Sequence, residues 1–169
     1  MKKLLPEERS STFPGRLLHD GRHYRVEILP GAKTVLLVRS PYPFVSPDDV
    51  DAGCTPVQLI LDKLGRSRYN VLVDTRHATA NNDPVYESWF EAHRKRMVQG
   101  FRRAAIVIRT AVGGLQTRRL VQHDASPVVL FTSMDDAIAY LEADGSVPPT
   151  AGGRMSSAPP VSGSRRIKE

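Results

Sequence analysis

Apolar positions near the start of the chain recur with a period of two, which predicts β-strands. Tyr24, Val26 and Ile28 alternate with their neighbours, so one face of this segment is expected to be buried. A Pro-Gly pair at 30–31 predicts a turn, because proline presets φ and glycine accepts a positive φ. The continuous apolar run at 34–39 is typical of a strand that is buried on both faces. The pattern therefore predicts a β-hairpin whose second strand lies inside a sheet.

Two more buried strands are predicted at 69–75 and 103–109. Before the first of them, helix-start signals occur twice, as Ser-Pro-Asp-Asp at 46–49 and as Thr-Pro at 55–56. We expect the stronger helix to span 56–64, because its apolar residues recur at helical spacing.

The next helix is predicted to begin at Asp83, as the N-cap, and Pro84, as the first helical residue. Gly100 ends it. Its apolar stripe has the spacing of one helix face and consists of Tyr86, Trp89, Phe90, His93 and Met97. We interpret His93 as a partnered histidine of the core.

The remaining elements are a helix near 112–122, a strand at 128–131 and a final helix capped by 132–136. The element order is thus β-β-α-β-α-β-α-β-α. A hairpin followed by βαβ units predicts an α/β fold, in which helices pack on a mixed β-sheet. The length of 169 residues suits one domain, which we place at 13–143.

Both ends of the chain differ in composition from this domain. Residues 144–169 are rich in Pro, Gly and Ser and are basic, and such a segment buries too little apolar surface to offset the entropy of ordering. We expect this tail to be disordered and residues 1–12 to be flexible.

The net charge of +6 raises the question of nucleic-acid binding. Part of the excess lies in the basic tail, and the Arg pairs of the domain lack the interleaved aromatic residues that stack on single strands. A nucleic-acid partner is therefore not predicted.

The single cysteine, Cys54, excludes an internal disulfide and fits a reducing compartment. The first residues lack the apolar core of a signal peptide, and no run of 18 apolar residues predicts a membrane span. We expect a cytoplasmic protein.

Candidate chemistry gathers after the strand at 69–75, because sites in open α/β sheets lie at the carboxyl ends of strands. In the following loop, His77 is positioned to pair with Asp74 or Asp83, which is the best catalytic arrangement that the sequence offers. Cys54 precedes a helix-start signal, which can lower a thiol pKa, but we interpret it as a small buried residue.

Two other kinds of site have weaker support. Gly113 and Gly114 open a helix, where backbone amides can approach an anion, although a simple helix entry also explains them. Neither a metal nor a cofactor is predicted from the five histidines.

The element order and three segments resemble the STAS superfamily, which contains the anti-sigma-factor antagonists, and above all its SpoIIAA-like branch with STAS/SEC14-type members. The segments are the strand at 71–76, the Asn-Asp-Pro junction at 82–84 and the C-terminal strand, acidic cap and alanine-rich helix at 129–141. The resemblance covers roughly 22–143. It implies a STAS-like domain with a bacterial signalling role.

The phosphoacceptor of that family is missing here. In phosphorylated anti-sigma antagonists, a Ser within an Asp-Ser-Ser-Gly-like turn starts the helix, whereas the matching position is Asn82 or Asp83. The resemblance therefore implies no phospho-site in the usual place. Asp83 is either a permanent mimic of the phosphorylated state or a plain helix N-cap, and we favour the cap.

We expect a non-enzymatic regulatory protein that binds a protein partner, either a regulatory protein or a kinase-like one, through the 76–84 loop and the helix after it. The predicted interaction surface comprises Asp74, Arg76, His77, Asn81, Asn82, Asp83, Thr110, Gly113 and Gly114. Two alternatives stay open, a small-molecule or lipid-binding module of SEC14-like type and a hydrolase-like enzyme that uses His77 and Asp74. The sequence does not set the oligomeric state.

Overall fold

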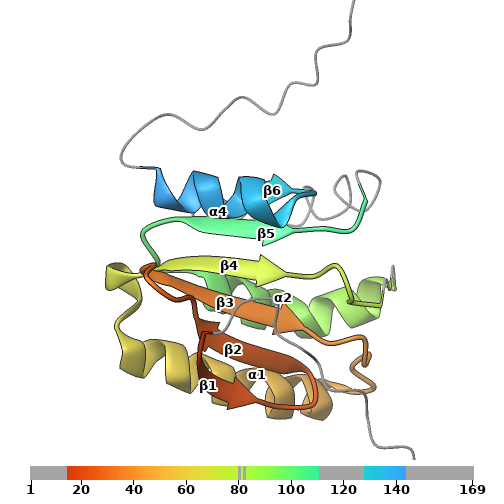
Figure 1. Cartoon of the computed structure of the whole chain (residues 1–169). Coiled ribbons are helices and arrows are strands. Elements are labelled where there is room, and N and C mark those ends of the chain that lie inside the picture. Colours follow the sequence, from red (N-terminus) through yellow and green to blue (C-terminus); the bar gives the residue numbers. More distant parts are fainter. Residues whose placement is uncertain (1–14, 80, 82, 111–127, 144–169) are drawn as a thin grey trace, which may run out of the picture.

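A six-stranded mixed sheet with helices on both faces forms the domain (Figure 1). The computed structural model describes residues 15–79, 81, 83–110 and 128–143. Its strands follow the chain order across the sheet, and they are β1 Arg16–Asp20, β2 Tyr24–Ile28, β3 Thr34–Arg39, β4 Asn70–Asp74, β5 Ala104–Val107 and β6 Val128–Phe131. β1, β2 and β3 pair antiparallel, and β3 to β6 pair parallel. The predicted fold class, a hairpin joined to βαβ units, is confirmed.

The described helices lie on both faces of this sheet. They are α1 Pro47–Leu64, α2 Pro84–Val98 and α4 Met134–Glu142, with a short 3₁₀ turn at Arg66–Arg68. α1 and α2 cover one face together, and α4 covers the other (Figure 1). None of the helices in the described part is long and apolar enough to cross a membrane.

The strand β1 is absent from the prediction, which began the sheet at Tyr24. β1 is an edge strand with exposed Arg16, Leu17 and Asp20, so its side chains show no alternation of buried and exposed positions. It joins the sheet through backbone pairing with β2. Backbone hydrogen bonds leave little trace in the sequence, and for this reason the strand was missed.

The prediction for α1 was wrong about its start, because the helix begins at Pro47 and contains Pro56. The Ser46 hydroxyl accepts a hydrogen bond from the Asp49 amide at 3.2 Å, so the first start signal is the real cap. A proline inside a helix costs about 3 kcal/mol, since it removes a backbone hydrogen bond. Burial of Val50 and Val57 on either side of Pro56 keeps the helix continuous.

The other local signals behave as predicted. Asp83 caps α2 and Ser133 caps α4, each by accepting a backbone N–H two or three residues later. Gly65 ends α1 with a φ of 81°, which only glycine adopts at little cost. The predicted helix near 112–122, the N-terminal segment 1–12 and the tail 144–169 lie outside the described residues.

Strand alternation assigns each side chain of the sheet to one of the two helical layers. Leu37, Val73 and Ile106 are neighbours in register and pack in the core under α1 and α2. Leu36 and Leu72 point the opposite way and pack against the α4 layer. The same alternation continues past the strand ends, where it decides which residues reach the site described next.

Candidate ligand pocket at the carboxyl ends of the strands

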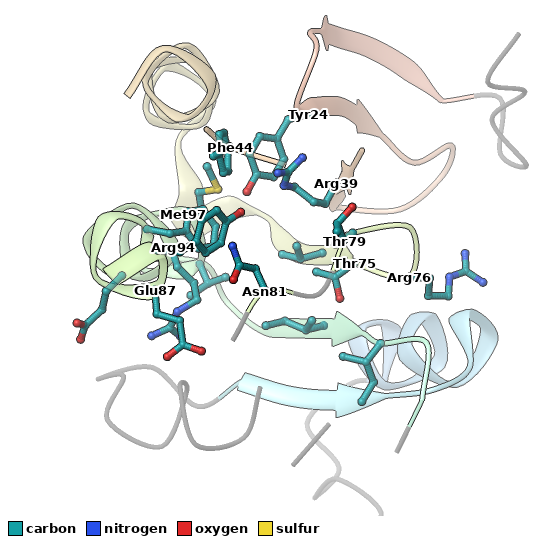
Figure 2. A pocket seen from close by; sticks show the side chains of 18 of the residues that line it. Tyr24, Arg39, Phe44, Thr75, Arg76, Thr79, Asn81, Glu87, Arg94 and Met97 are labelled. Atoms are coloured by element: carbon teal, nitrogen blue, oxygen red, sulfur yellow. The ribbon is translucent and has the colours of Figure 1, made fainter. Parts of the chain in front are cut away.

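A pocket of about 510 Å³ opens between α2 and the ends of the parallel strands. Figure 2 shows its lining, which comes from β2, β3, the loops after β3 and β4, α2, and the residues at the end of β5. Parallel strands end at the same sheet edge, so side chains from distant parts of the sequence meet there. Residues of the 76–84 loop form part of its wall.

Three residues at the strand ends face this pocket. Arg39 follows Leu37 by two positions, and Thr75 follows Val73 by two, so both point to the α2 face of the sheet. Ile108 follows Ile106 of β5 by two positions and also points to this face. Thr75 is fixed by its hydroxyl, which donates to the carbonyl of Val107 at 2.9 Å.

Arg39 is the buried cation of the pocket, with 7% of its surface exposed. Its Nη1 donates to the carbonyl oxygens of His23 at 3.2 Å and Ser40 at 3.0 Å, and also reaches the Ser40 hydroxyl. Its Nη2 donates to the Tyr42 carbonyl at 2.7 Å. The guanidinium therefore fixes the chain just after β3.

Aromatic rings support Arg39 from one side. Its guanidinium carbon lies 4.3 Å from the centre of the Phe44 ring and 5.4 Å from that of Tyr24, both within cation–π range. The His23 ring lies 4.3 Å from the Phe44 ring. A Cβ on Gly53 of α1 would meet Phe44 at 2.8 Å and His23 at 2.9 Å, so only glycine allows this close approach.

Asp49 holds His23 in place. The carboxylate lies 3.1 Å from His23 Nε2 and accepts the Val45 amide at 3.1 Å. Partial burial raises the pKa of Asp49, but these hydrogen bonds and the nearby positive charges outweigh it, so the pKa lies below its usual value. An ionised carboxylate thus holds the ring that packs against Phe44, a lining residue of the pocket.

Asp74, which the sequence analysis placed on the interaction surface, points away from the pocket. It lies in register with Val38 and Val107, which face α4. Arg76 binds it with both side-chain and backbone groups, at 2.9 Å from Nε, 2.8 Å from Nη2 and 3.0 Å from its amide. These hydrogen bonds raise the pKa of Arg76 and close the turn. Figure 2 shows Arg76 directed away from the other labelled side chains.

The histidine of the loop is not part of this pair. His77 is exposed, and we find no hydrogen bond or ion pair from it to Asp74 or Asp83 among the described residues. Asp74 is engaged by Arg76 instead. The His77–Asp74 arrangement of the hydrolase-like alternative is therefore not formed in this structure.

Of the predicted site residues, Arg76, Asn81 and Thr110 line the pocket. The Asn81 side chain accepts the Asp83 amide at 3.0 Å, and Asp83 in turn accepts the Val85 amide at 2.9 Å, which confirms Asp83 as the N-cap. Asn82, Gly113 and Gly114 lie outside the described residues, so the anion site proposed at the two glycines stays a prediction.

Three important residues of the pocket, Tyr24, Arg39 and Phe44, were not predicted from the sequence. A charge at the end of a buried apolar run, as at Arg39, was an available signal. The surroundings of Arg39 were not predictable, because its hydrogen-bond partners come from the segment before β2 and from the proline-rich segment after β3.

The remaining candidates for chemistry are structural. Cys54 is fully buried, and burial raises its pKa to about 12, so the thiol is a core residue as interpreted from the sequence. His93 lies between α1 and α2, where Nδ1 is 3.0 Å from the Gln58 amide nitrogen and Nε2 is 2.7 Å from Asp51. Among the described residues, no three acidic, histidine or cysteine side chains gather as a metal site.

One solved structure resembles this chain in its fold. It is an uncharacterised protein of the DUF3478 family with a SpoIIAA-like fold from Shewanella loihica PV-4, with a TM-score of 0.50 and 12% sequence identity. The match covers 73% of this chain and 98% of that one. No family model matches the sequence, and no curated protein matches it significantly. Together with the sheet order and the helical layers, the match shows that this chain has a SpoIIAA-like fold.

Proposed function

We propose that the protein is a binding module that holds a small, largely apolar molecule in the pocket beside α2. The observation that carries this proposal is the cavity of about 510 Å³ at the carboxyl edge of the parallel strands. This volume lies within the range of about 300–1,000 Å³ that small-molecule sites occupy. The location is also the usual one for ligand sites in open α/β sheets.

The lining supports a ligand more than a reaction. Apolar side chains such as Phe44, Val73, Phe90 and Ile106 form most of the surface of the wall, and polar side chains from the strand ends, the loop after β4 and α2 complete it. Binding sites combine these two features, because apolar contact supplies affinity and a few fixed polar groups orient the molecule. The one acid–base pair that the sequence offered, His77 with Asp74, is not assembled.

Native mass spectrometry of the full chain, purified without denaturation, tests this proposal together with fluorescence titration of the neutral probe N-phenyl-1-naphthylamine. We expect a retained small molecule or saturable probe binding at about one site per chain. Ala78, which lines the pocket in the loop after β4, provides a variant that blocks the cavity, Ala78→Trp. Ala92 is an exposed alanine of α2 outside the lining, so Ala92→Trp is the matched control.

The expected result is that Ala78→Trp weakens probe binding by at least about tenfold while Ala92→Trp leaves it unchanged, since only the former fills the ligand space. Absence of both a retained molecule and probe binding in the wild-type chain would overturn the proposal. Equal binding by the two variants would show that the probe occupies another place, with the same consequence.

The second candidate function is contact with a protein partner, and the exposed surface beside the pocket favours it. His77, Asn81 and Asp83 are exposed around the loop, and Val85 is an apolar residue of the first turn of α2 with 57% exposure. A protein partner that covers this surface would bury Val85 among these polar residues. In this proposal the protein acts in cytoplasmic signalling, without the phosphorylated Ser of the resembling family.

The substitution Val85→Arg tests this contact, and Arg76 is left intact because it neutralises the buried Asp74. Crosslinking and mass spectrometry in the native host should recover a partner with the wild-type chain and lose it with Val85→Arg. Leu59, with 53% exposure on α1, gives the matched control Leu59→Arg. Equal recovery with Val85→Arg and Leu59→Arg excludes the loop and the start of α2 as the contact surface.

A further inference from the structure

The pocket contains a buried cation that no carboxylate of the described residues neutralises. Arg39 donates to three carbonyl oxygens and to the Ser40 hydroxyl, and it forms no ion pair within the part of the chain that the structure describes. A buried charge without an opposite charge is costly, because carbonyl dipoles replace only part of its hydration. Since Arg39 lines the cavity, a ligand that enters can supply the missing negative charge.

A second donor lies beside it. Tyr24 is 2% exposed and lines the same end of the pocket, as Figure 2 shows for Tyr24 and Arg39. Burial raises the pKa of Tyr24 above its ordinary value, so the hydroxyl keeps its proton and remains a donor. We find no hydrogen-bond partner for this hydroxyl among the described residues, whereas buried tyrosines usually have one.

Most of the remaining surface of the cavity is apolar. Phe44, Val73, Met97 and Ile106 are among the apolar residues that line it. A fully polar anion such as free phosphate would leave these surfaces without contact. A molecule with an apolar body and one acidic group matches both parts of the site.

Two acids of α2, Glu87 and Glu91, also line the pocket. Glu91 binds Lys95 at 2.6 Å, which balances its charge. Glu87 lies at the α2 end of the pocket, on the side away from Arg39 (Figure 2). Arg94 of α2 also lines the pocket, but it is only half-buried, whereas Arg39 is buried, so Arg39 is the cation that gains most from an acidic group.

We propose that the pocket takes an apolar molecule with a single anionic group, of the carboxylate or sulfonate kind, and that Arg39 and Tyr24 bind this group. The proposal rests on the function proposed above and names its ligand class. A guanidinium with an adjacent hydroxyl is well suited to an acidic oxygen pair, because both groups donate and the contact is charge-assisted.

Two fluorescent probes with the same aromatic body separate the charge from the apolar contact. 8-Anilinonaphthalene-1-sulfonate carries an anionic group, and N-phenyl-1-naphthylamine lacks it. Titration of the full chain with both probes is compared between the wild type and Arg39→Met, which keeps an unbranched apolar side chain and removes the charge. We expect Arg39→Met to lower the affinity for both probes, and the fold-loss for the sulfonate probe to exceed that for the neutral probe by at least about tenfold.

Arg109, an exposed cation at the pocket rim, provides the control for general electrostatic attraction. The substitution Arg109→Met should change the affinity for either probe by less than about threefold, because water and salt screen an exposed charge. Dodecanoate should displace the neutral probe from the wild-type chain at a lower concentration than dodecanol does.

The outcomes distinguish the two proposals. If neither probe binds the wild-type chain, both proposals fail. If both probes bind the wild-type chain and Arg39→Met lowers the affinity for each by the same factor, the proposed binding function is supported and the anion site is overturned. If near-ultraviolet circular dichroism shows that Arg39→Met does not fold, Tyr24→Phe and the dodecanoate–dodecanol comparison decide instead. The anion site is contradicted if Tyr24→Phe lowers the affinity for the sulfonate probe less than the affinity for the neutral probe. It is also contradicted if dodecanoate and dodecanol displace the neutral probe at equal concentrations.

Discussion

Two arginines lie at the carboxyl edge of the same sheet and differ in how their charges are satisfied. Arg76 borders the pocket but forms a bidentate pair with Asp74, which faces the α4 side, and keeps 37% of its side chain exposed. Arg39 faces the α2 side, is buried, and has carbonyl oxygens and a hydroxyl as its partners in the described chain. Both fix the turn that follows their strand, so their shared role is structural.

The difference lies in what each side of the sheet leaves for a ligand. The charge of Arg76 is already neutralised by the carboxylate of Asp74 on the same turn, so it contributes little to the binding of an anion. The charge of Arg39 is oriented but not neutralised, and a cavity lies in front of it. A sequence scan weighs the two residues equally, whereas the alternation of the strands separates them.

Truncating each arginine to alanine gives the most direct test of this contrast. Arg39→Ala should lower the free energy of unfolding by about 3–4 kcal/mol, because it leaves three carbonyls unpaired and a void beside Phe44. Arg76→Ala should cost about 1–2 kcal/mol, because water replaces an exposed guanidinium and the amide of residue 76 still binds Asp74. Urea unfolding of the full chain measures both values.

The double variant Asp74→Ala with Arg76→Ala completes this test. It removes the buried carboxylate together with its partner, so its cost should be smaller than the sum of the two single costs. A larger loss from Arg76→Ala than from Arg39→Ala would contradict the contrast between the two sides.

Gly53 allows a test of the packing of Phe44 and His23 beside Arg39. In an ordinary helix, replacing glycine by alanine stabilises the fold by about 1 kcal/mol. Here the added methyl would lie 2.8 Å from Phe44 and 2.9 Å from His23, both of which are buried. We therefore expect Gly53→Ala to destabilise the protein by about 1–2 kcal/mol, since the ring under Arg39 must move.

The neighbouring exposed residue Ala52 gives the matched control for that substitution. Ala52→Gly should destabilise α1 by about 1 kcal/mol through helix propensity alone. Thermal unfolding followed by circular dichroism reports both variants. An increase in stability on Gly53→Ala would show that the packing between α1 and Phe44 is loose, and the role of Gly53 as a spacer would be wrong.

The fold was predictable where short segments determine structure by themselves. The Pro-Gly turn, the Asp83 cap and the apolar strands are such cases, because each depends on residues that are close in sequence. Where longer-range effects decide, the prediction was wrong. β1 is held by pairing to β2, and α1 continues through Pro56 because its buried face packs on the sheet.

The site was predictable only in part, for the same reason. The rule for open sheets located the loop after β4, and that loop does border the pocket. Alternation along the strand already separates Asp74 from Thr75, so the direction of Asp74 was available from the sequence. The environment of Arg39 was not, because it depends on Phe44, Tyr24 and a glycine of α1 that meet only in the folded chain.

The smallest expected effect concerns Asp49, which supports the Arg39 side through His23. Its folded pKa lies below the ordinary value near 3.8, so its ionised form contributes stability at higher pH. This contribution should be complete above the unfolded pKa and be lost as the pH falls through the folded pKa. Because 19% of the side chain is exposed, we expect a contribution of less than about 1 kcal/mol.

The variant Asp49→Asn isolates that contribution, since asparagine does not titrate. The difference in free energy of unfolding between the wild type and Asp49→Asn should be largest near about pH 6 and shrink toward zero near about pH 2. Asp48, an exposed acid on the same turn, gives the control Asp48→Asn, whose difference from the wild type should vary less. A difference for Asp49→Asn that stays constant over this range would mean that the Asp49 carboxylate does not hold the frame of the pocket, and the contrast between the two sides would then depend on Arg39 alone.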